Sequence, residues 1–365
     1  MQIRRSILLT GATGLIGRQL LARLVAADRR VRVYVLVRDL PRWSLVSLAV
    51  DEPGRVIPVQ GDLCAIGLGL SHNERATLRR ELSAIVHLAA DTTFSNSLDR
   101  AREVNVVGTQ RILELADECA SVVQLGHVST AFVAGRRTGT IEEDASTSVH
   151  GWVNAYEQSK QEAEQLVRKH AASWTIFRPS TVVCDDIDGR ISQTNAVHRA
   201  LRLLHAGLVA MMPGVEGSTI DVVTTAYVAG AIACLALDER VRGRIVHLCA
   251  GSRALRLTEL LDLTYERWAR DPDWRRRRIA RPALAELSTY ALFERTVEDV
   301  ADASLKRITR ALSHFVPQLA LPKRFVTSTA DTLLGYPAPP VAEFWPAMLD
   351  RLLAPRADSR ARNAA

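Results

Sequence analysis

Residues 10–18 read Thr-Gly-Ala-Thr-Gly-Leu-Ile-Gly-Arg, and this stretch decides the fold. A continuous apolar run precedes it and predicts a buried strand over 6–10. Apolar residues recur at helical spacing over 15–27, and a second apolar run over 31–37 predicts another strand. A strand, a glycine turn, a helix and a strand form a βαβ unit, so the sequence predicts a parallel sheet.

Three glycines give this turn its chemistry. Gly11 permits the tight turn, Gly14 lets the backbone approach a pyrophosphate, and Gly17 allows the helix to pack closely on the strand. The free N–H groups at the start of the helix then face the phosphates. The spacing is G-x-x-G-x-x-G, which by itself also fits a tight turn without a ligand. The flanking βαβ pattern favours a dinucleotide.

The alternation of strands and helices continues along the chain. Strands are predicted over 56–59, 85–88, 122–128 and 174–177, and helices over 98–119 and 155–170. We therefore predict an α/β fold, a Rossmann-type doubly wound parallel sheet with helices on both faces. After Pro179 the pattern changes. Strands over 219–223 and 245–248 are expected to rejoin the sheet, with a helix over 226–237 between them, and helices and loops follow.

These patterns predict two lobes. A Rossmann-type domain that binds a dinucleotide covers 1–185 and is rejoined by 219–250. A smaller, mostly helical C-terminal substrate lobe comprises 186–218 and 251–355, and 356–365 is expected to be a disordered tail.

Composition limits the class of protein. The chain has 365 residues, of which 47% are hydrophobic and 24% charged, as in a soluble globular protein. Its five cysteines form no C-x-x-C pair, which predicts a reducing, cytoplasmic setting without disulfides. The longest uncharged apolar stretch, 226–237, is shorter than the ~20 residues that span a bilayer, so no transmembrane segment is expected. The N-terminal apolar run is too short for a signal peptide.

The charge predicts the kind of partner. The net charge is +7 and comes almost entirely from arginine, which fits anionic partners such as cofactor phosphates, a phosphopantetheine arm or an acidic carrier protein. Nucleic acid is not expected, because there is no recognisable binding motif and aromatic residues are few. The nine histidines lack the spacing of metal ligands, so no metal is expected. His198 and His205 are expected to be structural, and the packed-strand role is favoured for His127 over contact with the site. The arginine run 275–278 favours a solvated face over a docking site for a carrier protein.

Arg38 bears on the choice of cofactor. It stands at the end of the second predicted strand, where an acidic residue would bind the ribose 2′-hydroxyl of NAD and an arginine favours the 2′-phosphate of NADP. Arg18 can assist from the start of the helix, whereas Asp39 would repel the phosphate if it pointed inward. We predict NADPH, with NADH less favoured.

Three further residues can handle a proton. Tyr156 and Lys160 lie four positions apart, on one face of the predicted helix. A neighbouring ammonium is expected to lower the pKa of the phenol from its usual ~10, which would bring proton transfer near neutral pH within reach. Thr130 ends the preceding strand, and ligands of such sheets bind at the carboxyl ends of the strands. Thr130 and Tyr156 are therefore expected in the same crevice.

At this point the residues resemble a family. The matching segments over about 3–185 are 11–17, Gly61-Asp-Leu63, His87-Leu-Ala-Ala90, Asn105-Val-Val-Gly-Thr109, Val128-Ser-Thr130, Tyr156-Glu-Gln-Ser-Lys160 and Arg178-Pro-Ser180. Together they resemble the extended short-chain dehydrogenases/reductases. The resemblance implies that Thr130, Tyr156 and Lys160 are catalytic and that Asn105 supports them. The predicted cofactor-binding residues are Gly11, Thr13, Gly14, Leu15, Ile16, Gly17, Arg38, Asp62 near adenine, Leu63, Ala89, Ala90, Lys160, Arg178, Pro179 and Ser180.

Finer features resemble the thioester-reductase and fatty-acyl-CoA-reductase branch. They are Ala89-Ala-Asp-Thr-Thr-Phe94, Arg178-Pro-Ser-Thr-Val182, Asp188-Gly189, Leu321-Pro-Lys-Arg-Phe325 and Phe344-Trp-Pro-Ala-Met348. This resemblance implies an NADPH-dependent reductase that converts an acyl thioester, bound to CoA or to a carrier protein in trans, to an aldehyde or alcohol. An aldehyde or ketone reductase, or a sugar-nucleotide epimerase or dehydratase, would use the same motifs. The sequence leaves open the substrate, its chain length and the oligomeric state.

Overall fold

The computed structural model describes residues 5–41, 43, 52, 54–121, 124–144, 150–170, 173–215, 217–301, 303, 305–306, 309–310 and 316–354. The predicted tail 356–365 lies outside the described residues.

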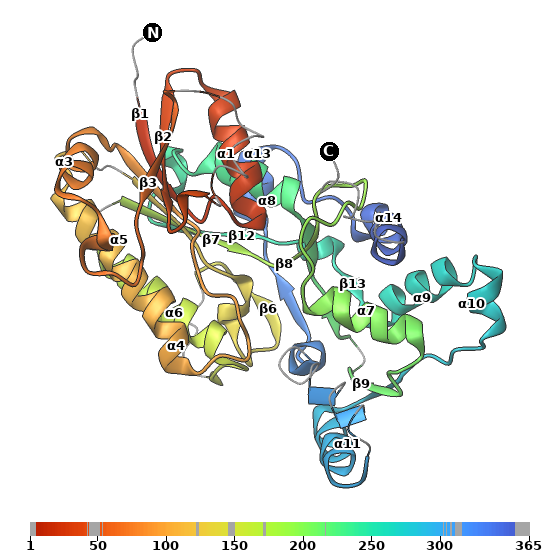
Figure 1. The fold of residues 1–365 in the computed structure, drawn as a ribbon. Helices are drawn as coiled ribbons and strands as arrows, with labels where there is room; N and C mark the ends of the chain where they lie inside the picture. The colour runs from red at the N-terminus through yellow and green to blue at the C-terminus, as the bar shows by residue number, and fades with distance from the viewer. Residues whose placement is uncertain are drawn as a thin grey trace, which may run out of the picture.

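A seven-stranded sheet, in which every pair of neighbours is parallel, forms the centre of the molecule (Figure 1). The strand order is β12-β7-β5-β4-β1-β2-β3. These strands are β1 (Arg5–Thr10), β2 (Val31–Val37), β3 (Val56–Gln60), β4 (Ala84–His87), β5 (Gln124–Val128), β7 (Ser173–Pro179) and β12 (Arg244–Leu248). Most of them are buried apolar runs because helices cover both faces of the sheet. The predicted Rossmann-type fold is confirmed.

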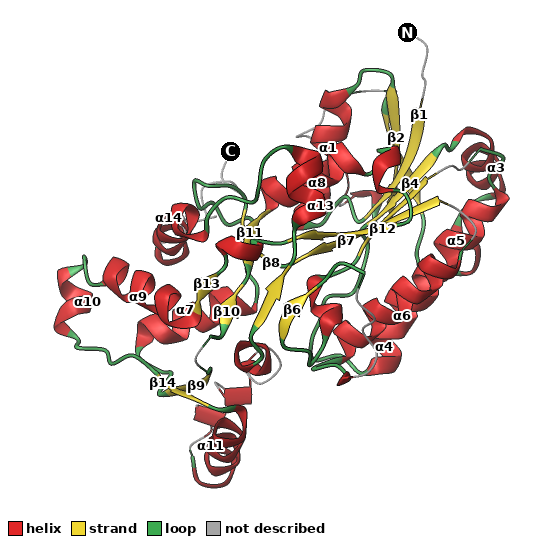
Figure 2. Ribbon diagram, turned by 180° about the vertical axis from the view of Figure 1, so that it is seen from behind, coloured by secondary structure: helices red, strands yellow, loops and turns green. Residues whose placement is uncertain are grey.

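Helices cover the two faces in separate groups (Figures 1 and 2). One face carries α1 (Leu15–Ala27), α8 (Thr225–Leu235) and α13 (Ser328–Leu334); the other carries α3 (His72–Glu81), α4 (Leu98–Arg102), α5 (Gly108–Glu118) and α6 (Ala155–Lys169). The strand order reverses between β1 and β4, so their carboxyl ends open a crevice there. The glycine loop and residues 88–90 leave the sheet at this point.

The remaining elements lie mainly beyond the carboxyl side of β7 and β12 (Figure 1). The helices are α7 (Ala196–Ala206), α9 (Leu257–Trp268), α10 (Pro272–Arg276), α11 (Leu287–Val300) and α14 (Val341–Leu353). The short strands are β6 (Gly139–Ile141), β8 (Thr181–Cys184), β9 (Met211–Pro213), β10 (Thr219–Ile220), β11 (Val222–Thr224), β13 (Leu255–Arg256), β14 (Ala283–Ala285) and β15 (Lys323–Phe325). Phe344 and Trp345 of α14 belong to the same buried cluster as Leu20 of α1, so this lobe shares one core with the sheet.

One predicted strand is wrong. The segment 219–223 does not rejoin the central sheet: β10 pairs antiparallel with β13, and β11 pairs with β8. Asp221 separates the two short strands, and its carboxylate accepts the backbone N–H groups of Ala250 and Gly251 at 2.8 and 2.9 Å. These bonds bend the chain toward the end of β12 and interrupt the apolar run. Only β12 joins the main sheet from the predicted 219–250 segment.

The segment 316–334 returns from the lobe to the Rossmann domain. β15 pairs in parallel with β6, and the N–H of Val326 donates to the carbonyl of Ile141 at 3.0 Å. His247 of β12 also bonds the carbonyl of Val326 through Nδ1, at 2.8 Å. Residues that the sequence assigns to the substrate lobe thus pack directly beside the sheet.

Candidate active site

The glycine loop joins β1 to α1 and leaves no room for side chains at two of its glycines. Gly11 has a φ of +75°, and a Cβ there would lie 2.7 Å from the backbone nitrogen of Ala89. A Cβ on Gly17 would lie 2.1 Å from the carbonyl oxygen of Gly11. The turn and the close packing of the helix therefore require these glycines. Gly14 is different, since it is exposed and a Cβ would meet only the carbonyl oxygen of Gly11, at 3.2 Å.

The start of α1 is built to hold an anion. Gly14 is its N-cap and provides no side-chain cap, and the N–H of Arg18 is the first to bond back, to the Gly14 carbonyl at 3.2 Å. The N–H groups of Leu15, Ile16 and Gly17 therefore have no partner inside the helix. Together with the positive end of the helix dipole, they fit a pyrophosphate. The exposed Arg18 lies over the loop and donates from Nε to the carbonyl of Thr13 at 3.0 Å.

A chain of hydrogen bonds ties this loop to the rest of the crevice. The Thr10 hydroxyl accepts the N–H groups of Leu88 and Ala89 at 3.2 and 3.1 Å, so it donates its own proton to Nδ1 of His87 at 2.7 Å. His87 must then carry its proton on Nε2, which donates to the hydroxyl of Thr109 at 3.2 Å. Burial lowers the pKa of His87 to about 3, so the ring is neutral.

Asn105 continues this chain toward the catalytic residues. It lies in a π-helical turn, Glu103–Val107, a feature that is common at functional sites. The Thr109 hydroxyl donates to its carbonyl at 2.6 Å, and its side-chain amide donates to the hydroxyl of Ser159 at 2.9 Å. Ser159 in turn donates to the carbonyl of Tyr156 at 3.0 Å. The predicted supporting position of Asn105 agrees with this geometry. The roles of Thr10, His87 and Thr109 were missed, although all three lie in quoted stretches of the sequence.

Thr130 and Tyr156 meet at the carboxyl end of β5. Thr130 precedes the short helix Ala131–Ala134 and accepts the N–H of Phe132 at 3.3 Å, while Tyr156 lies in the first turn of α6. The ring of Phe94 packs on Tyr156 with 5.5 Å between centroids. Burial raises the pKa of Tyr156 to about 12, and the hydrogen bond with Thr130 acts in the opposite direction.

Lys160 lies one turn further along α6 and is buried. Its Nζ donates to the carbonyl oxygen of Val128 at 2.8 Å. Burial lowers the pKa of Lys160 to about 8, against the smaller opposing effect of the Glu164 carboxylate. The predicted lowering of the Tyr156 pKa by Lys160 is wrong for this structure. The phenol is desolvated, which disfavours its anion, and the ammonium is held at a strand carbonyl.

His127 and Ser129 lie with Thr130, Tyr156 and Lys160, and these five residues form a candidate site that we call the catalytic cluster. His127 is fully buried, its ring lies 5.4 Å from that of His87, and neither of its ring nitrogens has a hydrogen-bond partner among the described residues. The Ser129 hydroxyl is buried and equally unpartnered in the described part of the chain. Burial and the Lys160 ammonium hold the pKa of His127 well below its usual value, so the ring is neutral. As favoured from the sequence, His127 is a packed strand residue.

The other predicted cofactor residues lie at the carboxyl ends of neighbouring strands. Arg38 is exposed immediately after β2, and Asp62 follows β3, where its carboxylate accepts the N–H of Cys64 at 2.8 Å. Leu63 is buried beside Gly108, and Ala89 and Ala90 are half-buried after β4. All five residues therefore surround the same end of the sheet as the glycine loop.

The side chain of Arg178 does not belong to a cofactor surface, contrary to the sequence prediction. Arg178 and Glu164 are 2% exposed and form a two-pronged ion pair with N–O distances of 2.9 and 2.6 Å. Its third nitrogen donates to the carbonyl of Glu143 at 3.2 Å. Each of its three guanidinium nitrogens thus donates a hydrogen bond inside the protein. Pro179 ends β7, and Ser180 is buried beside Asp221 and Cys249.

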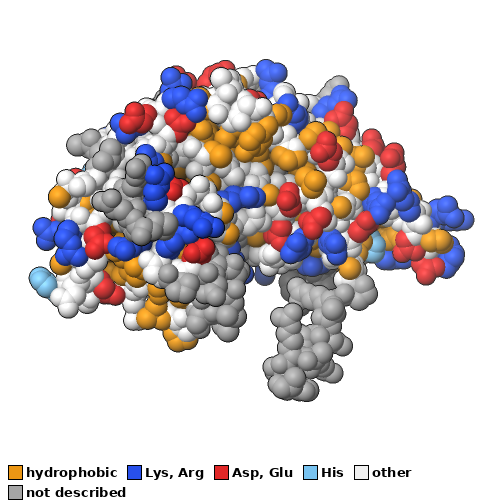
Figure 3. All heavy atoms as spheres, turned by 90° about the horizontal axis from the view of Figure 1, so that it is seen from above, with side chains coloured by type: hydrophobic (Ala, Val, Ile, Leu, Met, Phe, Trp, Pro, Cys, Tyr) orange, Lys and Arg blue, Asp and Glu red, His pale blue; other side chains and the backbone are white. Residues whose placement is uncertain are grey.

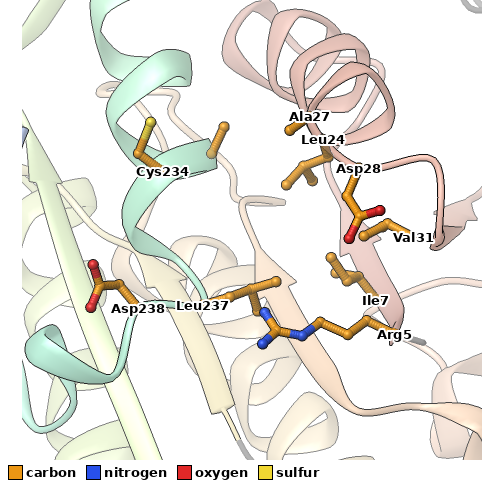
Figure 4. Close-up of a pocket in the computed structure, with 10 residues that line it drawn as sticks. Arg5, Ile7, Leu24, Ala27, Asp28, Val31, Cys234, Leu237 and Asp238 are labelled. Atoms are coloured by element: carbon orange, nitrogen blue, oxygen red, sulfur yellow. The ribbon is translucent and has the colours of Figure 1, made fainter.

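A cavity of about 270 Å³ lies at the end of the sheet opposite to the glycine loop (Figure 4). Arg5, Asp28 and Asp238 line it together with apolar side chains and Cys234. Because β1 begins at Arg5, this cavity is at the amino ends of the strands, away from the catalytic cluster. It therefore contributes nothing to the candidate active site.

Other sequence expectations concern the periphery. His198 caps its own helix by accepting the N–H of Asn195 at 2.9 Å and bonds the Val183 carbonyl, and His205 packs between Trp268 and Trp274. Both are structural. The described residues contain no group of three or more side chains that could hold a metal. Within the same residues, no helix has the length and apolar character needed to cross a membrane.

Comparison with known proteins identifies relatives of this chain. The model of the family described as male sterility protein, an NAD-binding family, matches residues 9–232, which is more than half of the chain. Fatty acyl-CoA reductase wat of Drosophila melanogaster is 27% identical over 222 residues, which cover 49% of this chain and 43% of that protein. The chain therefore spans less than half the length of this relative.

Solved structures agree with this assignment. The terminal R domain of the myxalamid PKS-NRPS biosynthetic pathway superposes with a TM-score of 0.78 and 26% identity, over 96% of this chain and 90% of that one. UDP-glucuronic acid 4-epimerase from Bacillus cereus gives a TM-score of 0.66 at 16% identity, over 95% and 98%, a likeness of fold alone. These matches confirm the predicted resemblance to the thioester-reductase branch of the extended short-chain dehydrogenases/reductases, which are oxidoreductases that use a nicotinamide cofactor.

Proposed function

The chain belongs to the male sterility protein family, and from this premise we propose that it is an NADPH-dependent reductase of acyl thioesters. The observation that carries the proposal is the juxtaposition of a phosphate-binding helix start with a buried proton donor. The uncapped first turn of α1 lies at the carboxyl end of β1, and the Thr130–Tyr156 pair lies at the carboxyl end of β5. Both are therefore at the same end of the parallel sheet. The hydrogen-bond chain through His87 and Asn105 links them.

The residues present fit a dinucleotide, which supplies a hydride when bound. The N–H groups of Leu15, Ile16 and Gly17 would hold its pyrophosphate, and Asp62 and Leu63 would lie near its adenine. Lys160 has ammonium protons beyond the one given to Val128, and these would bond the nicotinamide ribose. Ala89 and Ala90 would line its path along the crevice, next to Pro179.

Tyr156 is proposed as the general acid. Its hydroxyl gives a proton to the carbonyl oxygen of the substrate while the carbonyl carbon gains a hydride, and the Thr130 hydroxyl donates a hydrogen bond to the same oxygen. The raised pKa of Tyr156, about 12, keeps the phenol protonated over the neutral range and suits a donor. With a thioester, this addition produces a hemithioacetal. Cleavage of its carbon–sulfur bond then releases the thiol and leaves an aldehyde.

NADPH is preferred in this proposal because of Arg38 and Arg18. Both are exposed near the loop that follows β1, and a guanidinium pairs well with a phosphate. The 2′-phosphate of NADPH offers that group, whereas NADH offers a hydroxyl in the same place.

The acyl group is proposed to arrive as a thioester of CoA or of a carrier protein supplied in trans. The arginine run 275–278 gives limited support to carrier docking. Arg276 pairs with Asp273, and Arg277 caps α7 through the carbonyls of His205 and Ala206. Positive and negative side chains are interspersed on the face that Figure 3 shows. This agrees with the solvated face that the sequence favours.

A second candidate function is epimerisation or dehydration of a sugar nucleotide, since the epimerase fold resembles this chain. Net consumption of the cofactor separates the two. We expect the purified chain to oxidise NADPH in the presence of an acyl-CoA or acyl-carrier thioester and to release free thiol. A screen that also includes aldehydes and ketones would identify a simple carbonyl reductase, which would turn over those substrates and leave thioesters untouched.

A further inference from the structure

Beside the proposed proton donor, Glu157 is almost completely buried, with 1% of its surface exposed. One carboxylate oxygen accepts the N–H of Val153 at 2.9 Å, and the other accepts a hydrogen bond from the side-chain amide of Gln318. Gln318 lies in the short helix Val316–Ala320, far along the chain from α6. Burial of a carboxylate costs free energy unless it is well bonded, so this contact needs a reason.

Lys323 extends the contact. Its side chain is buried, and its Nζ donates to the amide oxygen of Gln318 at 3.1 Å and to the carbonyl of Leu321 at 3.5 Å. Lys323 is the first residue of β15, which pairs with β6. Gln318 therefore uses both ends of its amide, donating to Glu157 and accepting from Lys323. Two buried charged side chains, Glu157 and Lys323, and the half-buried amide of Gln318 thus connect the first turn of α6 to segment 316–325.

Burying these charged groups costs more free energy than apolar packing would in the same place. Glu157 and Lys323 attract each other across Gln318, and the positive charge of Arg136 also acts on Glu157. Glu157 is also the neighbour of Tyr156 in the chain, and its negative charge raises the pKa of that phenol. The connection thus acts on the position of the proton donor and on its acidity.

We infer that Glu157, Gln318 and Lys323 form a clasp that positions Tyr156 by seating segment 316–325 against the first turn of α6. The inference rests on the proposed function only for the reaction that Tyr156 serves. The three are positioning residues, since the clasp acts through Tyr156. Loss of the central amide should release both ends of the clasp and let α6 begin less regularly.

Hydrogen exchange of the purified full chain, measured by mass spectrometry without substrate, tests the seating directly. Gln318→Leu keeps the size of the side chain and removes both bonds. We expect exchange in peptides covering 150–160 and 316–325 to rise about tenfold or more, with no change in β1 and α8, because the loss is local. Arg324→Met is the matched control: it alters the exposed neighbour of Lys323 and should leave both peptides unchanged. Lys323→Met provides a second variant if Gln318→Leu does not fold.

Kinetics test the effect on catalysis. Gln318→Leu and Lys323→Met should lower kcat about tenfold or more, because small displacements of a reacting group are costly, while the KM for NADPH stays within about twofold. Glu157→Gln removes a carboxylate whose pKa burial raises to about 7, so an inflection of kcat near pH 7 in the wild type should disappear in this variant. Unchanged exchange together with wild-type kcat in both Gln318→Leu and Lys323→Met would overturn the clasp. A wild type that reduces no thioester but shows the expected exchange would overturn the proposed function alone.

Discussion

Two buried polar clusters share helix α6, and they are satisfied to different degrees. Around Glu164, every charged group of the paired cluster of Arg178, Glu164 and Glu143 is hydrogen-bonded. The three guanidinium nitrogens of Arg178 donate to Glu164 and to the Glu143 carbonyl, and the Glu143 carboxylate accepts from the backbone N–H of His247 and the hydroxyl of Thr329. One turn earlier in α6, the catalytic cluster around Lys160 has unused hydrogen-bonding groups. Among the described residues, His127 and Ser129 have no partner, and Lys160 donates to a single carbonyl.

This difference distinguishes a cluster with a structural role from a cluster that takes part in binding or reaction. A buried network whose members are all bonded holds elements together, whereas unsatisfied buried polar groups are costly and are retained at sites that bind or react. By this criterion the paired cluster fixes β7, α6 and segment 316–334, and we propose that the catalytic cluster serves a ligand. Both clusters contain residues that the sequence assigns to the site, and only the structure distinguishes them.

The largest expected effect comes from a substitution that breaks the paired cluster. Glu164→Ala leaves the Arg178 guanidinium buried without its counter-charge, which should lower the free energy of unfolding by about 3–5 kcal/mol. Urea unfolding followed by circular dichroism measures it. As a control, Glu162→Ala removes an ion pair on the more exposed face of the same helix and should cost less than about 1 kcal/mol. Equal losses in the two variants would contradict the distinction between the clusters.

The next effect concerns the catalytic cluster. Tyr156→Phe removes the proposed proton donor and keeps its shape, so the rate of thioester reduction should fall about 10²-fold or more. NADPH affinity, measured by fluorescence titration, should change little, and the urea midpoint should stay close to that of the wild type. Near-native turnover by this variant would show that Tyr156 is not the acid.

Lys160 predicts a pH dependence of stability. Its pKa is lowered from 10.5 to about 8 in the folded chain, so between these values the unfolded chain holds a proton that the folded chain has lost. The contribution of Lys160 to the free energy of unfolding therefore rises with pH in this window, by about 2 kcal/mol from pH 7.5 to 10. Lys160→Met removes it.

Urea unfolding of wild type and Lys160→Met at both pH values isolates this contribution. The free energy of unfolding of the variant should fall relative to that of the wild type as the pH rises. A constant difference between the two proteins across the window would mean that Lys160 keeps an ordinary pKa when folded.

The last effect sharpens the cofactor assignment. Arg38→Ser removes a charge-assisted contact to the 2′-phosphate, which is worth about 1.5–3 kcal/mol, so NADPH should bind about tenfold more weakly or worse, with NADH nearly unaffected. Isothermal titration with the two cofactors measures the ratio. Equal affinity of the wild type for NADPH and NADH would refute the assignment.

Much of the fold was predictable because its signals are local. The predicted helix over 15–27 matches α1 at both ends, where Gly14 is the N-cap and Asp28 the C-cap. The strands and helices around the glycine loop follow from an apolar pattern that neighbouring residues set. The crevice follows in turn, because parallel strands bring their carboxyl ends together.

The wrong predictions failed because of contacts between residues that are distant in the sequence. Nothing near Arg178 in sequence indicates that Glu164 will neutralise it, so its motif suggested a ligand. The run 219–223 has the pattern of one strand, but Asp221 bonds the backbone of residues 250 and 251 and divides it. The return of 316–334 to the sheet, and with it the clasp on Glu157, depends on pairing between β15 and β6, which no local pattern specifies.

We propose that this chain transfers a hydride to an acyl thioester with net consumption of NADPH. Incubation of the purified chain with NADPH and a panel of acyl-CoA and acyl-carrier thioesters, with oxidation followed at 340 nm and free thiol measured in parallel, tests it most directly. We expect thiol to appear together with oxidised cofactor for at least one thioester, and Tyr156→Phe to abolish both. Conversion of a sugar nucleotide without net loss of NADPH, with no thiol released from any thioester, would contradict it.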